Sequence, residues 1–129
     1  MIYLNFAGAV AGPLVTIGDV TIYSGHVSFV HNSDFRGAIR PADRQPFSFF
    51  VPESRPYAQP PARLWLELSL RRIKSLGGPD QVHFGAYDER VDVVADPRGG
   101  EHRWLQISLQ IPYYSLQEVD LNYRVTVQL

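Results

Sequence analysis

The fold of this chain is decided by residues 63–73, which read RLWLELSLRRI. The leucines of this stretch fall on every second position, and Trp65 and Glu67 lie between them. Because side chains alternate between the two faces of a β-strand, a period of two predicts a strand with one buried and one solvated face. The same period returns in residues 102–111 and 122–129, and no comparable stretch has helical periodicity. The sequence therefore predicts an all-β protein.

Further short strands are expected along the whole chain, separated by turn-forming residues. The expected strands cover residues 2–10, 14–18, 20–24, 26–31, 47–51, 63–73, 81–87, 90–94, 102–111 and 122–129. Gly18-Asp19 has the composition of a two-residue hairpin turn, and Ser24-Gly25 suggests a second reversal. The first thirty residues are therefore expected to form a meander. The nearly continuous apolar run at 47–51 suggests a strand that is covered on both faces.

This pattern of strands and turns favours two packed antiparallel sheets. We expect a β-sandwich of jelly-roll or immunoglobulin-like type, with a closed β-barrel as the alternative. The 129 residues suit a single domain over residues 1–129. The absence of cysteine fits a reducing compartment, so a cytoplasmic location is expected. Residues 1–6 read as a first strand rather than a signal peptide, and no apolar run approaches the ~20 residues of a membrane span.

Charge is unevenly distributed along the chain, although the formal net charge is only −1. Residues 1–33 carry one acid, Asp19, and no Lys or Arg. Residues 34–74 carry eight bases and four acids, a net charge of +4, and residues 75–129 carry four bases and eight acids, a net charge of −4. These segments can neutralise each other across a sheet or between two copies of the protein. The small net charge and the lack of arginines interleaved with aromatics disfavour nucleic-acid binding.

Residues 46–52, 82–88 and 99–102 read PFSFFVP, VHFGAYD and GGEH. In this order and approximate spacing they resemble a family of small bacterial all-β proteins of unknown function. In that family a Trp-Phe-x-Phe-x-Ile-Pro strand is followed by Val-His-Val-Tyr-Asp-Gly and then by Ser-Gly-Asp-His. Here Pro46 stands in place of the tryptophan, and Glu89 follows the aspartate in place of the glycine. The resemblance implies a β-sandwich and supplies no activity.

A group of histidines and carboxylates is the candidate for catalytic chemistry. With Tyr87 beside them, its members are His83, Asp88, Glu101 and His102. These residue types can form an acid-base or metal site, but no ligand spacing such as HxH or HExxH supports a metal, and neither metal nor cofactor is expected. His26 and His31 are five positions apart, which places them on opposite faces of one strand, so we do not expect them to share an ion.

Aromatic side chains on the solvated side of strands or in turns are the stronger candidates for a binding site. They are Trp65, Trp104, Tyr57, Tyr113 and Tyr114. Flat aromatic rings stack on sugars or on a partner surface, and Trp and Tyr are enriched at interface hot spots. Our first hypothesis is therefore a non-catalytic binding or assembly module that acts through protein contacts, including self-association. The alternatives are a small enzyme at the histidine and carboxylate group, and a carbohydrate-binding domain that uses Trp65, Trp104 or Tyr113.

Overall fold

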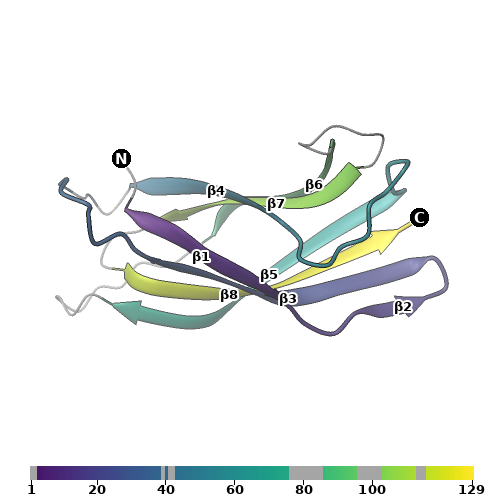
Figure 1. Cartoon of the computed structure of the whole chain (residues 1–129), viewed down its shortest axis with the longest axis horizontal. Helices are drawn as coiled ribbons and strands as arrows, with labels where there is room; N and C mark the ends of the chain where they lie inside the picture. Colours follow the sequence, from purple (N-terminus) through teal and green to yellow (C-terminus); the bar gives the residue numbers. More distant parts are fainter. Residues whose placement is uncertain (1–2, 39, 41–42, 76–85, 96–102, 113–115) are drawn as a thin grey trace.

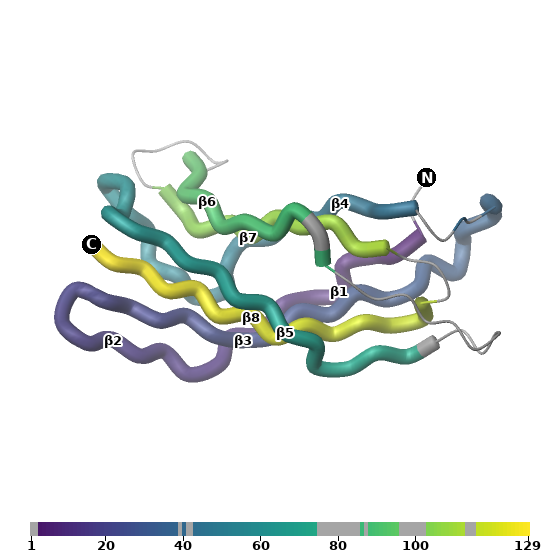
Figure 2. The backbone as a smooth tube through the Cα atoms, turned by 180° about the vertical axis from the view of Figure 1, so that it is seen from behind, coloured from purple at the N-terminus to yellow at the C-terminus, as the bar shows by residue number. Residues whose placement is uncertain are grey.

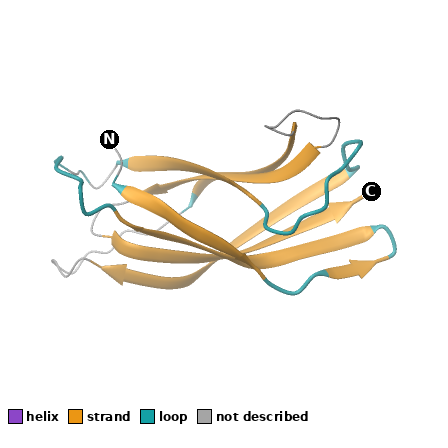
Figure 3. Ribbon diagram, in the orientation of Figure 1, coloured by secondary structure: helices purple, strands orange, loops and turns teal. Residues whose placement is uncertain are grey.

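The computed structural model describes residues 3–38, 40, 43–75, 86–95, 103–112 and 116–129. These residues form eight β-strands and no helix, so none of them belongs to a helix that could span a membrane (Figure 3). The strands are β1 (Leu4–Ala11), β2 (Val15–Ile17), β3 (Val20–His31), β4 (Arg44–Phe50), β5 (Arg63–Ser75), β6 (Tyr87–Ala95), β7 (Arg103–Pro112) and β8 (Leu116–Gln128). The predicted all-β class is confirmed.

The strands form two antiparallel sheets that lie over one another (Figure 1). Sheet A has the strand order β1-β3-β8-β5, and β2 also pairs with β3. Sheet B has the order β4-β7-β6. Figure 2 shows the same two layers from behind. No ladder joins the two sheets within the described residues, so the arrangement is sandwich-like and the closed barrel is not formed.

The hydrophobic core lies between the sheets and is supplied by every second residue of the long strands. On β7 and β8 the fully buried aliphatic residues are Leu105, Ile107, Leu109, Ile111, Leu116, Val119, Leu121, Val125 and Val127. On β5, Leu64, Leu66 and Leu68 face the same core but are only half-buried, because β5 is an edge strand of sheet A. The predicted inward phases of these three strands are confirmed. Leu70 differs from the prediction, since it precedes a bulge and is 45% exposed.

The oppositely charged segments of the sequence meet across β5 and β8. Arg72 Nη2 lies 3.8 Å from Glu118 Oε2, and Arg124 Nη1 lies 3.6 Å from Glu67 Oε2. These pairs are accessible to water, so each is worth only about 0–1 kcal/mol. Of the two pairs, Arg72 with Glu118 joins a base of the +4 segment to an acid of the −4 segment, so neutralisation across a sheet, one of the two predicted outcomes, is present at this pair. The uneven charge along the chain no longer argues for self-association by itself.

The turn at Gly18-Asp19 is a two-residue connection between β2 and β3, as predicted. Ile17 pairs with Val20 across it, and Gly18 has a φ of 61°, a conformation that favours glycine. The expected meander is wrong, however. Both β1 and β2 pair with β3, β1 along residues 25–31 and β2 along residues 20–22. They therefore follow one another along a single edge of sheet A.

The reversal predicted at Ser24-Gly25 is also wrong, because β3 runs without a break through both residues. Gly25 lies opposite Ala11 on β1 and Tyr123 on β8. A Cβ atom at this position would lie 2.5 Å from the Tyr123 hydroxyl oxygen and would collide with the carbonyl oxygen of Val10. The glycine therefore makes room for an aromatic ring and a neighbouring backbone rather than for a turn.

The Gln45 side chain joins the two sheets at the edge where β1 and β4 approach. Its Oε1 accepts hydrogen bonds from the backbone N–H groups of Tyr3 at 3.1 Å and Leu4 at 2.9 Å, and its Nε2 donates to the Leu4 carbonyl at 2.7 Å. The amide thus takes the place of a strand partner for β1. Beyond it, the ring of Phe6 stacks on that of Phe49 at 5.8 Å between centroids.

Sheet B leaves its outer side open. Within β4, Phe49 is buried against the core, whereas Phe50 points the other way and is exposed. The expectation that the strand at 47–51 is covered on both faces is therefore wrong. Residue 51 lies just beyond the end of β4, and Val51 is buried.

Candidate functional site

The outer face of sheet A, which turns away from sheet B, carries side chains from strands that are far apart in the sequence. On this face Ile22 of β3 lies opposite Val15 of β2 and Thr126 of β8. Thr126 in turn lies opposite Trp65 of β5. Since side chains opposite each other in a sheet point to the same face, these four residues form one row across four strands.

Most of the side chains at this end of the outer face are apolar. We call Val15, Ile17, Val20, Ile22 and Trp65 the apolar strip. Ile17 is 70% exposed, Trp65 44% and Val15 43%, while Val20 and Ile22 are half-buried. Single exposed hydrophobic residues are common on soluble proteins, but contiguous apolar patches mark interaction surfaces. The apolar strip is therefore a candidate contact surface.

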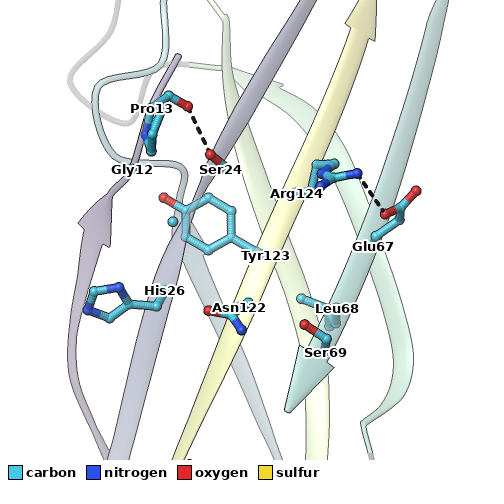
Figure 4. A pocket seen from close by; sticks show the side chains of 11 residues that line it. Gly12, Pro13, Ser24, His26, Glu67, Leu68, Ser69, Asn122, Tyr123 and Arg124 are labelled. Carbon is cyan, nitrogen blue, oxygen red and sulfur yellow. Dashed lines mark hydrogen bonds and ion pairs between the residues drawn. The ribbon is translucent and has the colours of Figure 1, made fainter. Parts of the chain in front are cut away.

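Next to the strip, the same face contains a groove with a volume of about 490 Å³. Its polar lining comes from three neighbouring strands, with Gly12 and Pro13 at one side (Figure 4). These polar residues are Ser24 and His26 of β3, Asn122 and Arg124 of β8, and Glu67 and Ser69 of β5. We call this cavity the outer-face groove. Its volume lies in the range of about 300–1,000 Å³ that is typical of small-molecule sites.

One ion pair and two hydrogen bonds shape the outer-face groove. Arg124 and Glu67 point toward each other across β8 and β5, 3.6 Å apart (Figure 4). The Ser24 hydroxyl donates to the Pro13 carbonyl at 2.8 Å, and the Gly12 N–H donates to the Ser24 carbonyl at 2.7 Å. These two hydrogen bonds of Ser24 hold the link between β1 and β2 against β3. One base and one acid balance in the groove, which suits an uncharged polar ligand.

Tyr123 lies between Asn122 and Arg124 on β8, but its side chain points into the core, where its ring contacts that of Phe49 and its hydroxyl group is buried. This hydroxyl has no hydrogen-bond partner among the described residues. Burial, with a smaller effect of the Glu53 carboxylate, raises the pKa of Tyr123 to about 12. The side chain therefore stays neutral at physiological pH and adds no charge to the groove.

The two histidines of β3 are separated as predicted. His26 lines the outer-face groove, whereas the His31 ring lies 4.9 Å from that of Tyr3, a core residue on the other side of the sheet. Within the part of the chain that the structure describes, no three His, Cys, Asp or Glu side chains cluster as metal ligands would.

The predicted catalytic group falls mostly outside the described residues. His83, Glu101 and His102 are among those that the structure does not describe. Asp88 is exposed on β6, with a φ of 52°, within the bulge that separates Tyr87 from Arg90. The acid-base or metal site therefore stays a prediction.

The two tryptophans lie on opposite sides of the molecule. Trp65 is on the outer face of sheet A, as its phase on the strand predicts. Trp104 occupies an outward position of β7 in sheet B and is half-buried. They cannot contribute to one binding surface. Tyr113 and Tyr114 lie outside the described residues.

Tyr57 fastens the proline-rich loop between β4 and β5 to both sheets. Its backbone exchanges two hydrogen bonds with Arg103 of β7, at 2.8 and 2.9 Å. Its hydroxyl lies 2.9 Å from that of Tyr23 on β3, and Tyr23 also accepts from the Arg55 N–H at 3.1 Å. Burial and the hydrogen bond with Tyr23 raise the pKa of Tyr57 above its usual value. The hydroxyl of Tyr57 thus makes contacts within the protein.

Sequence reasoning missed the aliphatic part of the apolar strip, although a signal was present. A two-residue hairpin places Ile17 opposite Val20, and Val15 opposite Ile22, on the same face. The sequence did not indicate that this face points outward while Tyr23 points into the core. The outer-face groove had no such local signal, because its residues meet only through the strand order.

Comparison with known proteins adds no relative to this picture. No family model, curated protein or solved structure matches the chain.

Proposed function

We propose that the protein is a non-catalytic binding module that holds a protein partner on the outer face of sheet A. The observation that carries this proposal is the apolar strip, whose residues come from β2, β3 and β5 and are uncovered in the described residues. Its aliphatic side chains favour a protein surface over a sugar. Trp65 is the expected anchor, since a large aromatic residue at the centre of a contact can carry more than about 2 kcal/mol of binding.

Site-specific photo-cross-linking tests this proposal. A photoreactive p-benzoylphenylalanine replaces Trp65 in one variant and Trp104 in a matched control, which also points outward but from sheet B. Irradiation in cells is expected to give one discrete protein adduct from position 65 and none from position 104, as resolved by mass spectrometry. Adducts of equal yield from both positions, or none from either, contradict the proposal.

A second candidate function is the binding of a saccharide in the outer-face groove. The groove combines hydrogen-bond donors and acceptors without net charge, and Trp65 lies one outward position beyond Glu67, where it can stack on a sugar ring. Hydroxyl-rich, uncharged ligands match this chemistry. The apolar strip favours a protein partner over this alternative, because its aliphatic half has no role in sugar binding.

A glycan array tests the second candidate, with two arginine variants compared. Arg124 pairs with Glu67 in the groove, and Arg90 pairs with Asp92 at 3.0 Å on sheet B. If the groove binds a saccharide, Arg124→Ala loses the glycan signal and Arg90→Ala keeps it. No signal from the unmodified protein, or equal signals from both variants, counts against the groove as a saccharide site.

A further inference from the structure

The apolar strip has charges of opposite sign at its two ends. Asp19 lies in the turn between β2 and β3, where its carbonyl accepts from the Leu129 N–H at 3.1 Å. Arg63 begins β5 at the opposite edge of the sheet, in the row that contains Gln128 and Val20. Both residues are exposed, and neither takes part in an ion pair within the described residues.

The strip is also uneven in shape across the strands. Its β2 side carries the aliphatic Val15 and Ile17, and its β5 side carries the flat ring of Trp65. A two-fold axis that lies in the face and runs parallel to the strands exchanges these sides. It places β2 of one copy over β5 of the other. Each cross-strand row of one copy then faces the same row of the other copy, because the axis does not shift residues along the strands. Such an isologous contact uses the same patch on both molecules.

We propose that the partner on the outer face of sheet A is a second copy of this chain, related by that two-fold axis. The inference rests on the proposed function, since it names the partner of the same strip. Val15 and Ile17 pack against Trp65 of the second copy, and Asp19 lies beside Arg63 of the second copy. Each such contact occurs twice. Because the axis is parallel to the strands, the strands of the two stacked sheets run parallel to each other, within the range of about 30° that aligned sheets keep.

Charge complementarity is the reason for choosing a second copy over a different protein. The two-fold axis brings the acidic end of the strip in each copy to the basic end in the other copy. Asp19 is the one charged residue between Val15 and Ile22, so no other charge from this hairpin enters the contact. The alkyl part of Arg63 also extends over Ile17 of the second copy, as long basic side chains do at contacts. A different protein would need its own groups to match the charged ends of the strip at Asp19 and Arg63 and the shapes of its β2 and β5 sides.

Charge reversal tests the inference, with sedimentation velocity as the readout. The unmodified protein is expected to dimerise as its concentration rises. Asp19→Arg places two arginines together at each contact, and Arg63→Asp places two aspartates together, so each variant alone should dimerise at least about tenfold more weakly. An equimolar mixture of the two variants should form a heterodimer, because both contacts then join Arg to Asp. The double variant should dimerise like the unmodified protein.

The matched control is Asp92→Arg, which makes the same change in net charge as Asp19→Arg but on the outer side of sheet B. It should leave dimerisation unchanged, and thermal melts of all variants should confirm that they fold. A protein that stays monomeric at every concentration overturns the inference. A dimer that both single reversals leave intact, or a mixture that forms no heterodimer, overturns it as well. If position 65 cross-links to a different protein, the inference fails while the proposed function stands.

Discussion

Leu105→Ala is expected to lower the free energy of unfolding by about 2 to 5 kcal/mol. Leu105 is completely buried on β7, the central strand of sheet B, and faces the core between the sheets. The substitution removes apolar surface from the core and leaves a cavity that the flanking strands cannot close, because β7 is paired on both sides. Chemical denaturation with circular dichroism measures the loss.

Trp104→Ala is the control for this substitution, one residue earlier on the same strand. Its side chain points away from the core and is half-buried, so most of the stability should remain. Trp104 also lies on the sheet opposite the apolar strip, so dimerisation should not change. Equal losses of stability in the two variants would show that both faces of β7 are buried. Trp104 would then be a core residue and not a candidate binding residue.

Gly25→Ala is expected to destabilise the protein by on the order of 3 kcal/mol, at the upper end of the typical cost of overpacking. The added Cβ collides with the Val10 carbonyl, which is backbone, and with the Tyr123 ring, which is buried. Neither neighbour can move without separating β1 from β3 or displacing core residues. A shift of the denaturation midpoint to lower denaturant concentration measures the effect.

Ser28→Ala is the matched control on β3. Ser28 lies on the outer side of the strand, opposite Asp120, so the change removes a hydroxyl group without adding a clash. Its midpoint should stay close to that of the unmodified protein. If Gly25→Ala has the same midpoint as well, the tight approach of β1, β3 and Tyr123 is not a real constraint on the fold.

The period-two pattern predicted the class of the fold because it reports directly on burial. In β5, β7 and the end of β8 the alternating leucines, isoleucines and valines face the core as expected, apart from Leu70. The pattern fails at the start of β8, where Val119, Asp120 and Leu121 are consecutive and all buried. It also failed at Gly25, since a glycine that accommodates a cross-strand ring looks the same in the sequence as a glycine in a turn.

The candidate site could be predicted only in part. The phase of Trp65 on its strand indicated an outward position, and the structure confirms that it is exposed. Val15 and Arg124 could not be connected with Trp65, because they come from β2 and β8, which share this face only through their places beside β3 and β5. Long-range strand order is not encoded in local periodicity.

The position of β8 in sheet A has a consequence for folding during synthesis on the ribosome. β8 is the last described strand to be synthesised, yet it lies between β3 and β5 and pairs with both along most of its length. Until it emerges, the edges of β3 and β5 that it later covers have no partner, and closing the sheet requires the chain to bring residues 20–30 and 118–128 together. Such distant pairings slow folding and expose unpaired edges to other nascent chains. Folding should therefore begin only after synthesis of this segment, and chaperone demand should be greatest just before it.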